Sequence, residues 1–282
     1  MNYHYSVVNF HIVNSCNYTC RYCFGKFGDK SFLSLPETEH VVEGIADYFR
    51  ASGITQGRIN LAGGEPLLYP YLDELIDRIH GKGIDVSIVT NGSLLTPSRI
   101  GSWRNKVACI GLSVDALSPE LNRAIGRCCH GEVKDLTHWT DLADACHEAH
   151  IALKINTVVS KLNLQENLLP LYRACRPQRI KLLKMHLVEN VNEEAREWDI
   201  TNDEHSAFCE RHEFANCPVR ESEGSMENSY LMVDPSGTVL LNDHGTYKAY
   251  GSCLTESFSE IACRLPLDSV KYAARYGGEV GA

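Results

Sequence analysis

Three cysteines near the start of the chain are the residues best suited to chemistry. They stand in the segment Cys16-Asn17-Tyr18-Thr19-Cys20-Arg21-Tyr22-Cys23, which has the spacing C-x3-C-x2-C. Thiolates are soft ligands that favour iron–sulfur clusters, zinc or Cu(I). A structural zinc site and a fully ligated [4Fe–4S] cluster each take four protein ligands. Three cysteines therefore leave one metal atom open to another molecule, unless their clustering is accidental or serves zinc.

Further polar motifs follow predicted strands. Gly63-Gly64-Glu65-Pro66 follows a strand predicted over 58–62, and Asn91-Gly92-Ser93 ends a strand predicted over 84–90. Ser113 ends a strand predicted over 107–114, and Arg127 follows later. Glycine lets the backbone approach a ligand closely, and a guanidinium fork suits a carboxylate. Each motif alone is more often a surface turn or a solvated charge. The evidence for a binding site is therefore the order in which the motifs follow one another along the chain.

Cations recur on predicted strands. Lys154 and Asn156 alternate on the strand predicted over 151–159, Arg179 and Lys181 on the strand over 179–187, and Arg58 begins the strand over 58–62. Period-two spacing puts each pair on one face of its strand. Buried cations are costly unless they meet an anion. Four of them on an acidic protein indicate a polyphosphate, whereas the alternative is strand-end charges that reach solvent.

The composition is that of an enzyme-sized globular protein. The chain has 282 residues, of which 44% are hydrophobic and 22% charged. Its net charge of −9 argues against a general nucleic-acid-binding surface. The twelve cysteines come without a recognisable signal peptide, so we expect reduced thiols and a cytoplasmic location. No apolar run approaches the ~18 residues of a membrane span, so we expect no membrane binding. We also expect the protein to be a monomer.

The chain alternates predicted strands and helices up to about residue 190. Strands are predicted over 5–13, 58–62, 84–90, 107–114, 151–159 and 179–187, and helices over 36–52, 71–80, 97–103, 136–150 and 164–175. Short connections through helices imply parallel strands, which favour a partial six-stranded (β/α) barrel with its sites at the carboxyl ends of the strands.

The pattern changes after residue 190. A helix is predicted over 202–211, a hairpin over 229–241 with its turn at Pro235-Ser236-Gly237, and a short helix over 257–263. The tail from Arg275 is predicted to be irregular. We expect residues 1–190 to form the barrel, and residues 191–282 to form an extension that covers the active site.

The motifs, in this order, resemble those of the radical S-adenosylmethionine (SAM) enzymes. The resemblance implies an α/β fold, a partial (β/α)6 radical SAM barrel with a C-terminal capping extension. It implies that Cys16, Cys20 and Cys23 hold three irons of a [4Fe–4S] cluster while SAM chelates the fourth. The positions that would contact SAM are Tyr22, Gly63, Gly64, Glu65, Asn91, Ser113 and Arg127.

Within these enzymes the chain resembles the viperin family over nearly its full length. The matching segments include Asn9-Phe10-His11, the cysteine motif extended to Phe24, Ile59-Asn60 before Gly63-Gly64-Glu65-Pro66, Ser87 to Ser93, Ile125-Gly126-Arg127, Lys154-Ile155-Asn156, Arg211-His212 and Ser229-Tyr230-Leu231. The resemblance implies conversion of a nucleoside triphosphate (CTP, UTP or GTP) to its 3′-deoxy-3′,4′-didehydro form, an antiviral chain terminator. The positions that would face the nucleotide are Asn9, Arg58, Lys154, Asn156, Arg179 and Lys181.

The family mechanism implies two further participants. An electron donor such as flavodoxin or ferredoxin would reduce the cluster, and a hydrogen donor would quench the product radical. The family tends to have a tyrosine after Gly-Gly-x, where this chain has Gly277-Gly278-Glu279-Val280, so Tyr276 or Tyr230 is the nearest candidate donor. We also expect residues 275–282 to order over the site when SAM and nucleotide are bound.

Two other functions remain open from the sequence. A radical SAM peptide-modifying enzyme usually carries extra cysteine clusters in its C-terminal part. Cys209, Cys217, Cys253 and Cys263 fall there, but their wide spacing contains no C-x2-C pair. The other alternative is a non-enzymatic iron–sulfur or zinc protein.

Overall fold

The computed structural model describes residues 5–25, 32–214, 218–221 and 224–276. It divides the chain into two compact units of discontinuous sequence. The first unit comprises residues 1–16, 25–88 and 224–282, and the second comprises residues 17–24 and 89–223. Each unit brings together segments that are far apart in the sequence, and each is described below by itself. The predicted boundary at residue 190 stays a prediction.

The first unit is built on strands from both ends of the chain. Their order is β10-β9-β8-β1-β2-β3. β2 and β8 both pair with β1 in parallel, β3 pairs with β2 in parallel, and β8, β9 and β10 are antiparallel neighbours. The bounds are β1 Val7–Val13, β2 Arg58–Gly63, β3 Asp85–Thr90, β8 Met232–Val233, β9 Thr238–Asp243 and β10 Thr246–Ser252. The predicted hairpin is therefore confirmed as β8 and β9, and it extends the sheet on the β1 side.

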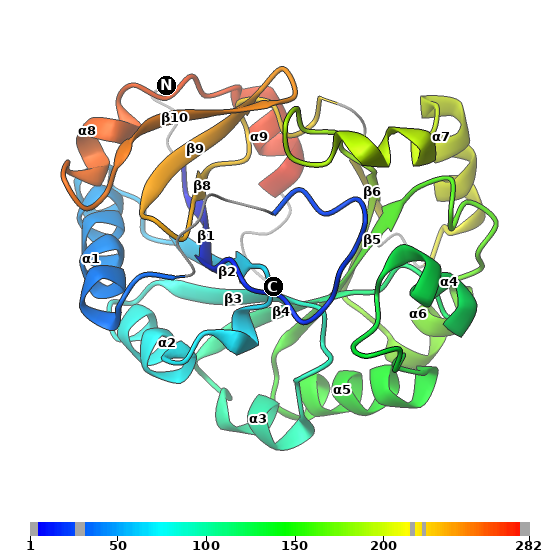
Figure 1. The fold of residues 1–282 in the computed structure, drawn as a ribbon. Helices are drawn as coiled ribbons and strands as arrows, with labels where there is room; N and C mark the ends of the chain where they lie inside the picture. Colours follow the sequence, from blue (N-terminus) through cyan, green and yellow to red (C-terminus); the bar gives the residue numbers. More distant parts are fainter. Residues whose placement is uncertain (1–4, 26–31, 215–217, 222–223, 277–282) are drawn as a thin grey trace. The chain divides into compact units, whose positions relative to one another are not determined.

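Helices α1 (Leu35–Ala51) and α2 (Leu72–His80) run beside these parallel strands (Figure 1). α1 begins where the Glu37 carboxylate accepts the backbone N–H of Ser34 over 2.8 Å, the return half of a capping box. Its apolar residues recur at helical spacing, and Val41, Val42, Ile45 and Phe49 are buried. The other short elements are η1 Pro66–Leu68, α8 Phe258–Ala262 and α9 Ser269–Tyr276.

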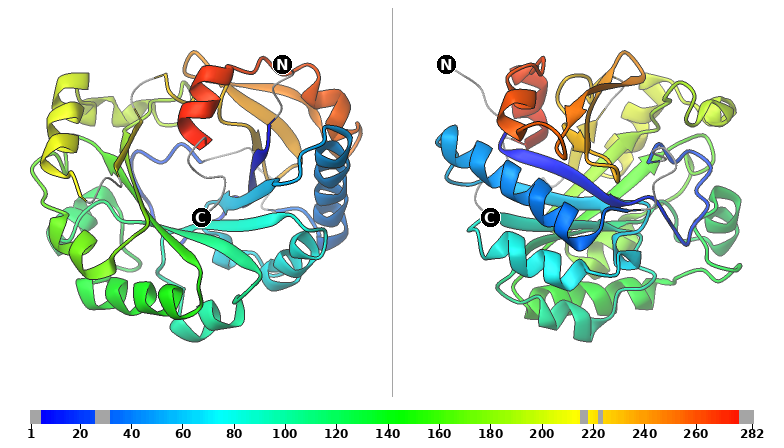
Figure 2. Two further views of the ribbon diagram at one scale, coloured as in Figure 1. Left: turned by 180° about the vertical axis from the view of Figure 1, so that it is seen from behind. Right: turned by 60° about the vertical axis from the view of Figure 1, so that its left-hand side comes forward.

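The second unit carries parallel strands in the order β4-β5-β6-β7, with β5 between β4 and β6. α5 packs against α3 and α6, as Figure 2 shows from two further sides. The strands are β4 Val107–Ser113, β5 Ala152–Val159, β6 Arg179–Lys184 and β7 Pro218–Glu221. The helices are α3 Pro97–Ser102, α4 Pro119–Ile125, α5 Leu136–Glu148, α6 Leu169–Cys175, η2 Glu193–Trp198 and α7 Asn202–Arg211.

Several elements differ from the sequence-based predictions. α6 begins at Leu169, not Leu164, because Pro170 is placed in its first turn, where proline is tolerated. α4, β7, β10 and α9 were not predicted. The prediction of an irregular tail is wrong for Arg275 and Tyr276, which are the last residues of α9, while residues 277–282 lie outside the described part. Among the helices that the structure describes, none is both long and apolar enough to cross a bilayer.

Candidate active site

The cysteine loop of the second unit is held by main-chain hydrogen bonds. The backbone N–H groups of Thr19 and Arg21 donate to the carbonyls of Gly126 and Ile125, each over 3.0 Å. Gly126 has φ of +89°, and a Cβ there would lie 2.3 Å from the Thr19 carbonyl oxygen. Glycine is therefore required at this position, both for the left-handed backbone and for the close approach. The Ile125-Gly126-Arg127 motif thus supports the loop.

The end of β3 holds the start of the same loop. The Asn91 side-chain amide donates to Asn17 Oδ1 over 2.9 Å, and Asn17 Nδ2 donates to Ser93 Oγ over 2.8 Å. Asn91 Oδ1 also accepts the backbone N–H of Ser93 over 2.9 Å. Asn91 was predicted to contact SAM; in this structure its amide fixes the loop next to the cysteines.

A buried ionic network lies behind Tyr22. The Tyr22 hydroxyl and Arg127 Nε both donate hydrogen bonds to Oδ2 of Asp115, a residue with no exposed surface. Burial and the Asp115 charge raise the pKa of Tyr22 well above its usual range, so the phenol stays protonated. Burial is the largest influence on Arg127 and opposes its charge, but Asp115, Cys20 and Tyr22 together outweigh it and raise the pKa of the guanidinium well above its usual range. Asp115 was missed by the sequence analysis, although it is an acidic residue directly after an apolar strand.

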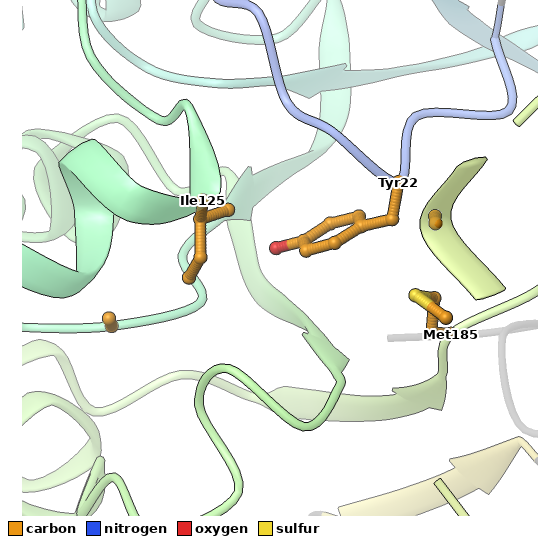
Figure 3. Close-up of a cluster of buried hydrophobic side chains, with 5 residues drawn as sticks. Tyr22, Ile125 and Met185 are labelled. Atoms are coloured by element: carbon orange, nitrogen blue, oxygen red, sulfur yellow. The ribbon is translucent and has the colours of Figure 1, made fainter. Parts of the chain in front are cut away.

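The Tyr22 ring lies in an apolar cluster. Ala116, Ile125, Met185 and Ala195 are the other buried members. The ring points from the loop toward Ile125, with Met185 close to its base (Figure 3). The loop between Cys20 and Cys23 is thus fixed by packing as well as by hydrogen bonds.

The three motif cysteines are more exposed than four of the other cysteines that the structure describes. Cys16 is exposed, and Cys20 and Cys23 are half-buried. Cys146, Cys175, Cys209 and Cys253 are buried, and burial raises the pKa of these thiols to about 11 for Cys209 and about 12 for the others. Because the thiolate is the metal ligand, the accessible trio fits an iron–sulfur cluster better than the buried thiols do. The burial of Cys209 and Cys253 also argues against a second cluster there.

The part of the chain that the structure describes contains no group of three or more His, Cys, Asp or Glu side chains already arranged to hold a metal ion. Cys16 belongs to the first unit, whereas Cys20 and Cys23 belong to the second. The donor set fits a cluster by its chemistry, since three soft ligands, each exposed or half-buried, stand in one loop.

The Gly63-Gly64-Glu65 turn of the first unit packs on the residues that lead into Cys16. The Gly64 and Glu65 N–H groups donate to the carbonyls of Val13 and Ser15 over 2.7 and 2.9 Å. Added Cβ atoms at Gly63 and Gly64 would lie 2.3 and 2.2 Å from these same carbonyl oxygens. Glu65 is fully buried, and its carboxylate accepts the N–H of Leu67 over 3.1 Å. The glycines thus have a packing role besides the predicted contact with SAM.

One face of the first unit's sheet carries a chain of side-chain hydrogen bonds. Register places Asn9 beside Asn60, and Asn60 beside Ser87. Ser87 Oγ donates to Asn60 Oδ1, Asn60 Nδ2 donates to Asn9 Oδ1 over 2.9 Å, and Asn9 Nδ2 donates to the hydroxyl of Tyr276 over 3.0 Å. Two predicted residues, Asn9 and Tyr276, are therefore in direct contact. Asn60 and Ser87 stand in segments that resemble the viperin family but were not predicted as site residues, although Asn60 follows Arg58 at period-two spacing.

The second unit has a polar face of its own. Lys154 lies beside Arg179, and Asn156 beside Lys181, so all four predicted residues share one face of the β5–β6 pair. On β4, a Cβ at Gly111 would lie 3.0 Å from both Lys154 Cε and Asn156 Nδ2, so these side chains extend over the glycine. Lys154, Asn156 and Lys181 are buried.

Two of the predicted cations have protein carboxylates nearby, which corrects part of the sequence argument. Lys181 pairs with Glu221 of β7 over 3.0 Å, and both side chains are less than one-tenth exposed. Arg58 Nη2 lies 3.7 Å from Asp85 Oδ2. The argument that buried cations need an external anion is therefore wrong for Lys181, because β7 was not predicted and supplies the carboxylate.

Ser113 and Arg127 meet in the second unit. Arg127 Nη1 donates to the Ser113 carbonyl over 3.4 Å. Both residues line a small recess together with Tyr18, Val114, Asn122, Val133, Lys134 and Trp139. Burial raises the pKa of Tyr18 to about 12, so its phenol is a neutral hydrogen-bonding group at this recess.

Comparisons with known proteins show what the chain is similar to. The sequence pattern of the Radical SAM superfamily matches residues 10–166. The chain is 31% identical to an S-adenosylmethionine-dependent nucleotide dehydratase of Selenomonas ruminantium, over 96% of this chain and 98% of that protein. It is 33% identical to one from a Thermoplasmatales archaeon (strain ISO4-H5), over 86% and 84%. The zebrafish (Danio rerio) S-adenosylmethionine-dependent nucleotide dehydratase RSAD2 is 30% identical, over 81% and 65%.

Solved structures share the fold at low sequence identity. The chain is similar to native anSMEcpe with bound AdoMet and the Cp18Cys peptide, with a TM-score of 0.71 and 16% identity over 94% of this chain and 81% of that one. Streptococcus suis SuiB bound to S-adenosylmethionine gives a TM-score of 0.64 and 15% identity, over 95% and 67%. With the superfamily match, these confirm the predicted fold class, an α/β partial (β/α)6 radical SAM barrel.

Proposed function

Because the chain belongs to the radical SAM superfamily and, within it, to the family of S-adenosylmethionine-dependent nucleotide dehydratases, we propose that it converts a nucleoside triphosphate (CTP, UTP or GTP) to the 3′-deoxy-3′,4′-didehydro analogue. The reaction removes the 3′-hydroxyl as water and makes the enzyme a lyase. The product would serve as a chain terminator in antiviral defence. The supporting observation in this chain is the shared face of Lys154, Asn156, Arg179 and Lys181.

The family's cofactors are a [4Fe–4S] cluster and SAM, which together supply a carbon radical able to abstract a hydrogen atom. Cys16, Cys20 and Cys23 would hold the cluster as thiolates. In our proposal the Gly63-Gly64-Glu65 turn holds the ammonium group of SAM, and the Arg127 guanidinium pairs with its carboxylate. The other proposed contacts to SAM are made by Tyr22, Asn91 and Ser113.

The nucleotide would be bound by polar side chains of the two sheet faces. We assign the phosphates to Lys154, Arg179 and Lys181, because cations on one buried face bind a polyphosphate through charge-assisted hydrogen bonds. For Lys181 this requires an exchange of partners, from Glu221 to a phosphate oxygen. Asn9, Arg58 and Asn156 would complete the contacts. Precise placement of the ribose is this chain's main contribution to rate, since the cofactors carry the bond-breaking chemistry.

Tyr276 is our candidate for the final hydrogen donor. Its hydroxyl is already oriented by Asn9, and burial raises the pKa of Tyr276 well above its usual range. A neutral phenol can donate a hydrogen atom. The proposed closure by residues 275–282 falls mostly outside the described residues, and only Arg275 and Tyr276 have described positions.

The remaining parts of the proposal concern the setting of the reaction. We propose a cytoplasmic monomer that receives electrons from flavodoxin or ferredoxin and binds neither nucleic acid nor membrane. We also keep a barrel of residues 1–190 and an active-site cover of residues 191–282 as the functional division of the chain.

One experiment tests the proposed reaction. The protein is reconstituted anaerobically with iron and sulfide, reduced, and given SAM with CTP, UTP, GTP or the matching monophosphate. We expect one triphosphate to raise 5′-deoxyadenosine formation at least tenfold and to yield a product lighter by one water, as measured by mass spectrometry. If no nucleotide changes SAM cleavage, the proposed substrate class is wrong.

A further inference from the structure

The Asp115 carboxylate connects three segments of the second unit. Its carboxylate accepts hydrogen bonds from three segments at once: the Tyr22 hydroxyl in the cysteine loop, Arg127 Nε after α4, and the backbone N–H of Val158 in β5 over 2.7 Å. Asp115 has no exposed surface. A buried carboxylate is retained only with such partners, because an isolated one would be strongly destabilising.

The backbone around Asp115 is held as firmly as its side chain. Asn163 donates from Nδ2 to the Asp115 carbonyl over 2.9 Å, and Asn122 Nδ2 donates to the Ala116 carbonyl over 2.9 Å. The carboxylate is therefore a fixed point to which the more exposed cysteine loop is attached.

The other side of Tyr22 is held independently. Asn192 donates from Nδ2 to the Tyr22 carbonyl over 3.0 Å, and its Oδ1 accepts the N–H of Val188 over 2.7 Å. Tyr22, which directly precedes Cys23, is thus held at its ring hydroxyl and at its main chain.

We infer that Asp115 is a positioning residue that links the cysteine loop to the SAM-binding guanidinium: it fixes Tyr22, and with it the spacing of Cys20 and Cys23, while it aims Arg127. This inference deepens the cofactor-binding part of the proposed function and does not depend on the identity of the nucleotide. If Asp115 served only in folding, it would be equivalent to another carboxylate that holds the loop after β4.

The chain offers a matched control for that distinction. Glu166 accepts the backbone N–H groups of Leu117 and Ser118 over 2.7 and 3.1 Å, two and three residues after Asp115. Glu166→Gln and Asp115→Asn each remove one negative charge, and both carboxylates hold the loop that follows β4. Of these two carboxylates, Asp115 is the one that accepts hydrogen bonds from the Tyr22 hydroxyl and from Arg127.

The test compares wild type, Asp115→Asn, Tyr22→Phe, the double variant and Glu166→Gln. The first readout needs no cofactor: the rate at which iodoacetamide alkylates Cys20 and Cys23 in the apoprotein, mapped by mass spectrometry. The second is the electron paramagnetic resonance spectrum of the reduced reconstituted cluster with and without SAM, and the third is the Kd for SAM. None of these readouts uses a nucleotide, so their outcome is separate from that of the dehydratase assay.

We expect Asp115→Asn to alkylate at least fivefold faster at Cys20 and Cys23, to bind SAM at least tenfold more weakly, and to lose or alter the spectral change caused by SAM. Tyr22→Phe keeps the ring but loses the hydroxyl, so it should show the faster alkylation with a smaller loss of SAM affinity. The double variant should resemble Asp115→Asn, because the two substitutions break the same hydrogen bond.

The inference is overturned if Asp115→Asn matches Glu166→Gln in all three readouts, or if the effects of Tyr22→Phe and Asp115→Asn simply add. If Asp115→Asn yields no folded protein, Tyr22→Phe decides alone. Wild-type alkylation rates and an unchanged spectrum in Tyr22→Phe then exclude the link.

Discussion

The side-chain amide of Asn9, in the first strand, donates a hydrogen bond over 3.0 Å to the hydroxyl of Tyr276, the last residue of α9. Both side chains are buried. The same amide donates to the Leu231 carbonyl over 2.9 Å, which joins β1 to the segment before β8. A residue near the start of the chain therefore orients the one near its end that we propose as a hydrogen donor.

Tyr276→Phe should uncouple SAM consumption from product formation. The variant keeps the ring but cannot donate a hydrogen atom, so product formed per 5′-deoxyadenosine should fall at least fivefold while the Kd for SAM stays unchanged. Losing one buried hydrogen bond should also lower the free energy of unfolding by about 0.5–1.5 kcal/mol. Both products are measured in one anaerobic assay by mass spectrometry.

Tyr272→Phe is the control for this loss of stability. Tyr272 lies one turn earlier on α9, and its hydroxyl accepts the backbone N–H of Val7 over 2.8 Å. We expect a similar stability loss with a normal product ratio. If both variants give the same product ratio as wild type, Tyr276 is not the donor.

Lys181→Ala should weaken triphosphate binding. A charge-assisted hydrogen bond contributes about 1.5–3 kcal/mol, so the Kd should rise roughly ten- to a hundredfold while SAM binding is unchanged. Glu221→Gln should act in the opposite direction, because it removes the carboxylate that competes with phosphate for Lys181. Both Kd values are obtained by calorimetry with a non-reacting deoxynucleotide.

Lys184→Ala provides the matched control. Lys184 is buried like Lys181 and lies 3.6 Å from Asp199, but it stands three residues along β6 and so on the opposite face. We expect destabilisation without loss of triphosphate affinity. Equal losses of affinity in the two variants would contradict the assignment of one face to phosphate.

Cys20→Ala should abolish cluster assembly, because two thiolates cannot hold three irons. Cys129→Ala changes a cysteine of similar exposure in the same unit and should retain wild-type iron and sulfide. Iron and sulfide are counted after anaerobic reconstitution. Wild-type stoichiometry in Cys20→Ala, together with intact SAM cleavage, would show that the cluster has been assigned to the wrong cysteines.

His11 should make the protein less stable in mild acid. Burial lowers the pKa of His11 to about 3, against about 6.5 when unfolded, so between these values the unfolded chain binds the extra proton. The stability from keeping this ring neutral is present above pH ~6.5 and is lost as the pH falls toward 3; by pH 5 the loss is about 2 kcal/mol. His11→Phe should remove that part of the pH dependence in urea unfolding. Equal slopes in the two proteins would refute it.

The sequence predicted the parallel strands, the cysteine loop and the polar strand faces, because these depend on local spacing and period-two alternation. It could not predict which residues of neighbouring strands lie side by side. That Lys154 lies beside Arg179, and Asn9 beside Asn60, depends on the register of the strands. The four-residue β7 was too short to be recognised, and with it Glu221, the partner of Lys181, was missed.

Asp115 shows the same limit within the candidate site. Its position after an apolar strand was visible in the sequence, but its three partners are 93, 12 and 43 residues away along the chain. Arg127 was predicted to pair with the carboxylate of SAM; in this structure it pairs with the carboxylate of Asp115. The contact with SAM remains part of our proposal.

Gly126→Ala should prevent the cysteine loop from docking. A methyl group there would lie 2.3 Å from the Thr19 carbonyl oxygen, and both groups belong to backbone that cannot move aside cheaply. Gly131→Ala is the control, since its φ of +81° is close to the +89° of Gly126 but a Cβ at Gly131 meets nothing within 4 Å. Both variants carry the left-handed strain of about 1–2 kcal/mol, and only Gly126→Ala adds the steric clash. We therefore expect Gly131→Ala to load iron normally and Gly126→Ala to lose most of it, with faster alkylation of Cys20; equal iron contents would mean that the loop does not need this contact.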